Sequence, residues 1–203
     1  MVSLTTRQIS LISIMSAASI AIAYSKDLVA FLPGVEFMTV LIFVTGYCFG
    51  RVIGFPVGVI ALTIYMLIPF PFAHPAAWLF TTSPILLVVM ALLGGMYGVA
   101  GDLLSRRFTP KRELGYALVM GVAGFVLTFI YDIMSSVGFA LAYPAFTTIW
   151  QSIVYTFIPL YMPYPPIVHT ITNSIIFAVV APALIIAIRN LPDPAVQRND
   201  DDS

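Results

Sequence analysis

The chain has 203 residues, of which 60% are hydrophobic and 9% are charged, and its nine basic residues balance nine acidic ones. Soluble domains are about 45–50% apolar. This composition, with a mean hydropathy of +1.01, therefore excludes an ordinary soluble domain and indicates a single membrane bundle. No basic run interleaves with aromatic residues, so the sequence argues against a nucleic-acid partner. Because Cys48 is the only cysteine, no disulfide can form within the chain.

Six apolar blocks separated by polar breaks predict six transmembrane helices. The predicted ranges are Leu4–Tyr24, Val35–Gly50, Ile53–Ile68, Pro84–Leu104, Leu114–Ala140 and Ile167–Ile188.

The first block has two further features. Ala21-Ile22-Ala23 resembles a signal-peptide cleavage site. We nevertheless expect the block to be retained, since its removal would leave five spans and disturb the charge pattern described below. Ser13, Ala17 and Ala21 recur every four residues and form a stripe of small side chains. Such a stripe suits helix packing within the chain or docking of another membrane protein equally well.

The second and third blocks are shorter than the roughly 20 residues that cross a hydrocarbon core. Only Gly50-Arg51-Val52 separates them, so we expect a tight helical hairpin. Glycines recur every fourth residue through this hairpin and favour close packing of helix backbones. They are Gly46, Gly50, Gly54 and Gly58.

Three connecting segments follow the odd-numbered blocks: Ser25–Gly34, Pro69–Ser83 and Leu141–Pro166. The second is rich in proline, which predicts a stiff, non-helical cap. The third contains apolar residues at helical spacing between Ile149 and Ile158, which predicts a short interfacial helix that ends before Pro159.

Basic residues sort to one side of the predicted bundle. Eight of the nine lie at the N-terminus or after the second, fourth and sixth blocks, and only Lys26 lies in the other set of loops. Basic residues in short loops stay in the cytoplasm. The sequence therefore predicts a multi-pass protein of the cytoplasmic membrane, with both termini inside. Residues 1–190 form one domain, and the polar tail 191–203 is expected to be disordered.

Polar side chains cluster near the outer ends of the predicted spans. Glu36 opens the second span and Asp132 lies in the outer part of the fifth, while His169 and Asn173 share one face at the start of the sixth. Such groups are costly inside a membrane. Their convergence under aromatic loops predicts a small-molecule pocket open to the outside. The predicted ligand-binding residues are Glu36, Phe37, His74, Trp78, Tyr131, Asp132, Tyr155, His169 and Asn173.

Each of these candidates also has a structural interpretation. Glu36 could be solvated or cap its helix, Asp132 could make a structural hydrogen bond, and His169 with Asn173 could join helices. The Trp and Tyr residues could form an interfacial belt, and His74 could be structural. Metal-site spacing is absent, so we predict neither a metal site nor a cofactor.

The sequence also lacks a Gly-rich phosphate loop and the common hydrolase motifs, so we predict no enzymatic activity. Two other functions stay open. A proton-coupled secondary transporter would use Asp132 near the membrane midplane. An intramembrane enzyme would use His169 and Asp132, with Ser135 or Ser136 as the nucleophile.

The chain resembles the substrate-binding S component of energy-coupling factor (ECF) vitamin transporters. The resemblance rests on six spans in 203 residues, on Ala17-x-x-x-Ala21, on Gly34-Val35-Glu36-Phe37 and on His169-Thr-Ile-x-Asn173. It implies a high-affinity binder whose cargo lies in an outward-facing cavity. It also implies docking through Ala17 and Ala21, with Ser13 extending the same stripe, onto a transmembrane coupling (T) component that two cytoplasmic ATPases drive.

The outer half of the predicted pocket holds Glu36 and Asp132 but no arginine, and Lys26 is its only lysine. A carboxylate vitamin would need charge-assisted partners. We therefore expect a neutral or cationic ring compound, thiamin-like or riboflavin-like, that can stack on aromatic side chains. A corrinoid is also compatible with these residues.

Overall fold

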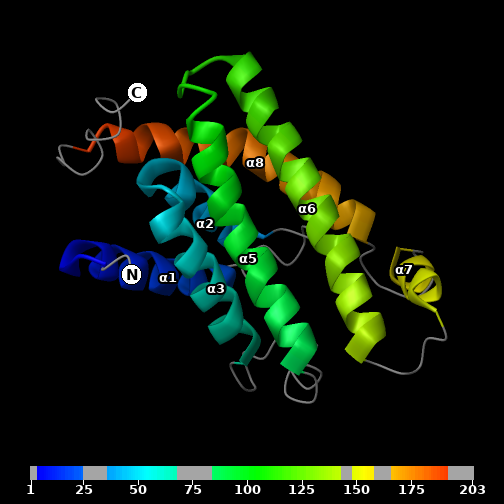
Figure 1. Ribbon diagram of the computed structural model, residues 1–203. Helices are drawn as coiled ribbons and strands as arrows, with labels where there is room; N and C mark the ends of the chain where they lie inside the picture. The colour runs from blue at the N-terminus through cyan, green and yellow to red at the C-terminus, as the bar shows by residue number, and fades with distance from the viewer. Residues whose placement is uncertain (1–3, 25–35, 68–83, 143–147, 158–165, 192–203) are drawn as a thin grey trace.

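The computed structural model describes residues 4–24, 36–67, 84–142, 148–157 and 166–191, and within these ranges the regular secondary structure is entirely helical. This confirms the predicted all-α class for the described part of the chain. The described helices are α1 (Thr6–Ala23), α2 (Phe37–Phe49), α3 (Arg51–Leu67), α5 (Pro84–Ser105), α6 (Leu114–Ala142), α7 (Ile149–Phe157) and α8 (Pro166–Arg189) (Figure 1).

Four of the described helices, α1, α5, α6 and α8, are long and apolar enough to cross a membrane. The other two apolar helices of the bundle are shorter, since α2 has 13 residues and α3 has 17. At 1.5 Å per residue they span about 20 Å and about 25 Å, less than a hydrocarbon core of about 30 Å. By length and composition the described helices are compatible with a multi-pass membrane protein, and the full count of six spans stays a prediction.

Helix ends follow local signals in the sequence. α1 begins after Thr5, whose hydroxyl accepts from the backbone N–H of Gln8 while its own N–H donates to the Gln8 side chain at 2.9 Å. This capping box satisfies two N–H groups that the helix leaves unpaired. α2 and α3 are joined by Gly50 alone, whose φ of 81° favours glycine. The predicted hairpin is therefore confirmed, with a shorter connection than the expected three residues.

Glycines bring the backbones of α2, α3 and α5 into direct contact. A methyl group added at Gly46 would overlap the backbone of Gly98, and one at Gly98 would overlap the backbone of Gly54. One at Gly58 would overlap the backbone of Gly94. The packing role predicted for the hairpin glycines is confirmed for Gly46, Gly54 and Gly58, which meet α5, but not for Gly50, which forms the turn. Close approach of three backbones offsets the small contact area that short helices offer.

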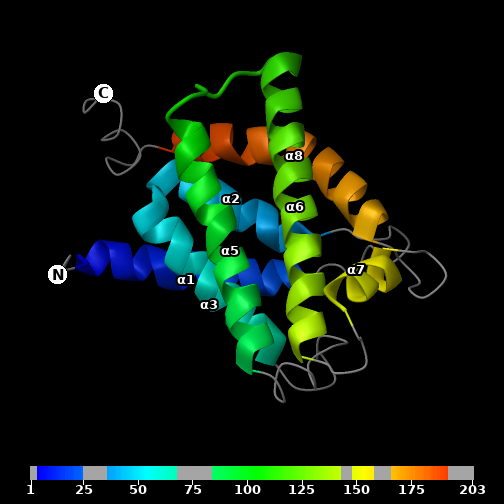
Figure 2. The ribbon, with the colours of Figure 1, turned by 45° about the vertical axis from the view of Figure 1, so that its right-hand side comes forward.

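α8 packs against α6 and also reaches α2. Both ribbon views show α8 crossing α6 at a steep angle (Figures 1 and 2). Phe177 of α8 fills the centre of the crossing, where its ring lies 5.2 Å from that of Phe43 and 6.2 Å from that of Tyr97. All three side chains are fully buried. Aromatic packing thus joins α8 to the part of the bundle that the glycines hold together.

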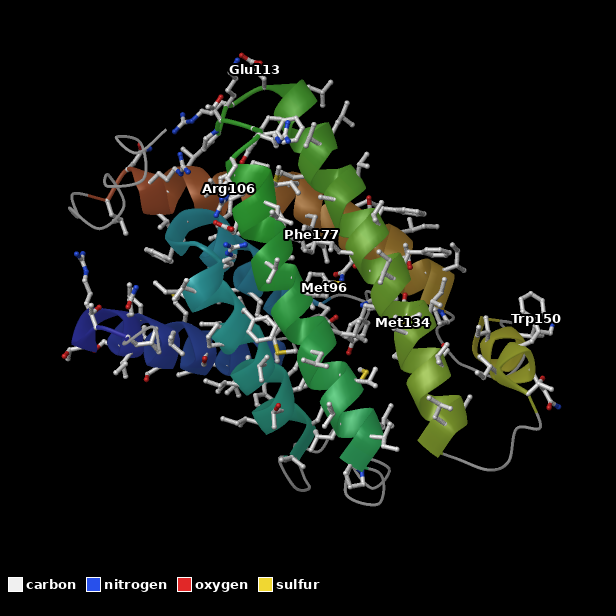
Figure 3. The ribbon with its side chains drawn as sticks, viewed as in Figure 1. Met96, Arg106, Glu113, Met134, Trp150 and Phe177 are labelled. Carbon is white, nitrogen blue, oxygen red and sulfur yellow. The ribbon has the colours of Figure 1, made fainter. Side chains whose placement is uncertain are left out.

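Basic groups gather at one end of the bundle. Arg106 pairs with buried Asp102 at 2.9 Å in the last turn of α5. The hydroxyl of Tyr47 donates to the carbonyl of Phe108, and the Arg189 guanidinium lies 5.5 Å from the centre of the Tyr47 ring. Figure 3 labels Arg106 at this end. These contacts hold the ends of α2, α5 and α8 together with the loop that follows α5.

α7 confirms the predicted short helix between α6 and α8, and it contacts both of them. Trp150 on α7 is 73% exposed and points away from the bundle (Figure 3). The predicted proline-rich cap, the first connecting segment and residues 192–203 of the tail lie outside the described residues.

We predict that Gly98→Ala lowers the free energy of unfolding by about 1–3 kcal/mol, because the added methyl group forces α3 and α5 apart. The matched control is Gly115→Ala, since a methyl group there would meet nothing within 4 Å. Its stability should be unchanged or slightly raised. Unfolding of both variants in detergent micelles tests this, and equal stabilities would contradict the packing argument.

Candidate functional site

His169 lies between two carboxylates at the end of the bundle opposite Arg106. Its Nδ1 is 2.9 Å from Oδ1 of Asp132, and its Nε2 is 3.2 Å from Oε2 of Glu36. The imidazole ring therefore joins α8 to α6 and to the start of α2. A doubly protonated imidazole donates from both nitrogens, so this geometry favours the charged ring.

Asp132 is the more buried of the two carboxylates, with a side chain only 7% exposed. Its second oxygen, Oδ2, accepts a hydrogen bond from the Thr170 hydroxyl at 2.9 Å. Both carboxylate oxygens thus have a protein partner, as a buried carboxylate requires.

Glu36 differs from Asp132 in its environment. Its side chain is 21% exposed, and although it occupies the N-cap position of α2 it makes no side-chain cap bond. Glu36 thus lies where the capping alternative placed it, but its carboxylate bonds to His169 and not to the backbone of α2. Its partial exposure leaves it the more accessible carboxylate of the pair.

Asn173 lies fully buried one helical turn beyond His169. Its Nδ2 donates to the Thr128 hydroxyl at 3.2 Å and to the Thr39 hydroxyl at 3.5 Å, and Tyr97 donates to Thr128 at 3.3 Å. The Asn173 carbonyl oxygen has no hydrogen-bond partner among the described residues. A buried unpaired acceptor costs about 1–3 kcal/mol. The Asn173 carbonyl oxygen is therefore the atom of this cluster that would gain most from a hydrogen-bond donor on a ligand.

An aromatic side chain completes the described part of the cluster. Tyr131 is 8% exposed, and its ring centre lies 6.5 Å from that of His169 in an edge-on arrangement. The Tyr97 ring lies 6.2 Å from that of Tyr131. The rings of Tyr97 on α5 and Tyr131 on α6 thus border the polar groups on one side.

Of the nine predicted ligand-binding residues, the structure brings five together. They are Glu36, Tyr131, Asp132, His169 and Asn173. Phe37 is partly exposed in the first turn of α2, and no described contact joins it to this cluster. His74, Trp78 and the side chain of Tyr155 lie outside the described residues.

Four further members of the cluster were not predicted: Thr39, Tyr97, Thr128 and Thr170. The threonines carried a signal that could have found them. Thr128 precedes Asp132 by four residues, Thr39 follows Glu36 by three and Thr170 precedes Asn173 by three. Residues three or four apart share a helix face. Tyr97 had no such signal, because its own helix contributes no ionisable group to the cluster.

The hydroxyl groups of the two serines that follow Asp132 bond to the backbone of their own helix. Ser135 and Ser136 donate to the backbone carbonyl of Asp132 at 3.0 Å and 2.8 Å. Since both nitrogens of His169 face carboxylates, the imidazole is not oriented as a base for either serine. Within the described residues, no group of three or more His, Cys, Asp and Glu side chains could hold a metal ion.

The small-residue stripe of α1 faces away from the bundle. Ser13, Ala17 and Ala21 are all exposed, whereas Ile12 and Ser19 on another face are buried. Within the described part of the chain the stripe is therefore not used for internal packing.

We predict that Asp132→Ala lowers the free energy of unfolding by about 2–4 kcal/mol, because it leaves His169 and Thr170 without their acceptor. Glu36→Ala should cost less, since that side chain is partly solvated. The control Ser135→Ala should change stability by about 0.5 kcal/mol or less. Unfolding in detergent measures all three, and a larger cost for Glu36→Ala than for Asp132→Ala would contradict the assignment.

No protein-family model matches this chain, and no curated protein or solved structure matches it either. The resemblance to ECF S components therefore continues to rest on the motifs of the sequence.

Proposed function

We propose that this protein is the membrane-embedded, high-affinity substrate-binding subunit of an ATP-driven ECF-type importer of a vitamin or related small molecule. The observation that carries the proposal is the convergence of Glu36, Asp132, His169 and Asn173 from three helices at one end of the bundle. Buried polar groups in a membrane protein mark ligand pathways and sites. The protein itself has no enzymatic role, and the partner ATPases hydrolyse ATP.

The charges of the cluster favour a neutral or cationic ring compound. With both carboxylates ionised, the single imidazolium of His169 leaves one uncompensated negative charge. The carbonyl oxygen of Asn173, which no described residue pairs with, adds an acceptor for a ring N–H or hydroxyl group. Neither Lys nor Arg makes a described contact with the cluster, so a carboxylate vitamin would lack a charge-assisted partner. Thiamin-like and riboflavin-like compounds fit best, and a corrinoid is compatible.

The distribution of basic residues supports one orientation of the protein in the membrane. Arg106 and Arg189 lie at the end of the bundle opposite the His169 cluster. Under the positive-inside rule their end is cytoplasmic. The protein then has six spans, with α2 and α3 counted, both termini in the cytoplasm and the cluster open to the outside of the cytoplasmic membrane.

The exposed stripe on α1 supports a transmembrane partner. Small residues let helix backbones approach closely inside a membrane, where lipid offers little competition for packing. We assign Ser13, Ala17 and Ala21 to docking onto a T component that two cytoplasmic ATPases drive.

A stand-alone proton-coupled transporter is the second candidate, and one observation favours it. Glu36, His169 and Asp132 form a continuous chain of ionisable groups between helices, as a proton relay would. The two candidates differ in whether uptake requires an ATPase.

The first prediction for this function concerns the ligand. Titration of the purified protein with a panel of vitamins should detect tight binding of a neutral or cationic ring compound. Asn173→Ala and Glu36→Gln should each weaken that binding about tenfold or more, since each removes one hydrogen bond or charge. The control Ser135→Ala should bind as the unchanged protein does. Tight binding of a carboxylate vitamin, unaffected by changes at Glu36 and Asp132, would contradict the proposed ligand class.

The second prediction concerns the partner. Cells that express this chain with an ECF coupling module should take up the ligand, and Ala17→Leu with Ala21→Leu should reduce uptake about tenfold without changing ligand binding. Val88→Phe, which adds bulk at an exposed apolar position of α5, is the matched control and should not reduce uptake. Uptake that persists when the ATPases are inactive would instead support the proton-coupled transporter.

A further inference from the structure

A groove of about 450 Å³ lies between the loop that follows α5, the first turn of α6 and the second half of α8. It belongs to the basic end of the bundle and is separate from the His169 cluster. Figure 2 shows the loop between α5 and α6 at the same end as the C-terminal half of α8. Lys111, Arg112 and Glu113 come from the loop, and Ala117 comes from α6.

The part of the groove contributed by α8 is apolar and lined by short side chains. Ala178, Ala183 and Ala187 alternate there with Val179 and Ile186. Val179 is 67% exposed, as is expected of a side chain that faces lipid. Three alanines on a helix long enough to cross a membrane leave a depression that an extended apolar chain can fill.

The polar part of the groove carries an excess of positive charge. Lys111 and Arg112 are exposed, and neither makes an ion pair with another described residue. Glu113 is the one acidic residue of the lining. These charges stand directly before the first residue of α6, beside the end of α8 at Arg189. The ends of membrane-spanning helices lie at the level of the lipid headgroups, so both cations are at the depth of a phosphate.

We propose that this groove binds an anionic phospholipid, with one acyl chain along the alanines of α8 and the phosphate beside Lys111 and Arg112. Both halves of the site are needed to select this ligand. A zwitterionic lipid would fill the apolar part but carries no net charge for the cations to attract. A soluble phosphate would meet the cations but leave the apolar part unfilled.

The test is native mass spectrometry of the full chain in detergent with equal amounts of phosphatidylglycerol and phosphatidylcholine. The unchanged protein should retain phosphatidylglycerol preferentially. The double variant Lys111→Gln with Arg112→Gln should lower this retention about tenfold, since two cations near the headgroup are lost. The matched control, Arg51→Gln with Arg107→Gln, removes the same charge from exposed residues outside the groove and should keep the preference.

A second variant tests the apolar half. Ala183→Phe keeps every charge but fills the groove, and it should also lower phosphatidylglycerol retention about tenfold. An excess of inorganic phosphate should not displace the bound lipid. Equal retention by the groove variants and the control, or displacement by phosphate alone, would overturn the proposal. Vitamin binding should be unchanged in all these variants, so the outcome is independent of the proposed importer function.

Discussion

A carboxylate inside a bundle of apolar helices must be matched by protein groups, and the arrangement of α2, α6 and α8 follows from how Asp132 meets this requirement. Its two oxygens engage His169 and Thr170, and the other face of His169 engages Glu36. His169 and Thr170 belong to α8, Asp132 belongs to α6, and Glu36 lies at the start of α2. This network fixes the rotation of α2, α6 and α8 about their axes. Removal of any of its members leaves another polar group without a partner.

The rest of the bundle is held by the opposite kind of contact. Between α2, α3 and α5 the backbones touch through Gly46, Gly54 and Gly98, without polar side chains. Such contacts leave little room for adjustment. The His169 cluster, by contrast, retains a partly exposed carboxylate at Glu36 and an Asn173 carbonyl oxygen that no described residue pairs with. The closely packed α2, α3 and α5 thus support the His169 cluster, which can still form further hydrogen bonds. A rigid support beside free hydrogen-bonding groups suits a ligand site.

The sequence predicted Glu36, Asp132, His169 and Asn173 because ionisable and amide groups are conspicuous in apolar helices. Threonines are not, since a threonine in a helix usually bonds to its own backbone, as Thr45 does to Leu41 at 2.7 Å. Thr128 and Thr170 instead bond to other helices. The sequence carried no signal for Asp102, which precedes a basic loop, whereas the structure buries it and pairs it with Arg106.

By itself the sequence determined the membrane class, the helical content, the approximate ends of the helices and the identity of the four polar candidates, because these depend on local hydropathy and on residue chemistry. Only the tertiary structure decided that Asp132 is buried while Glu36 stays accessible, that the Asn173 carbonyl oxygen has no partner in the described part of the chain and that the Ala17 stripe faces outward. These properties depend on how each helix is rotated against its neighbours. That rotation is set by glycine contacts and polar bonds between residues far apart in the chain.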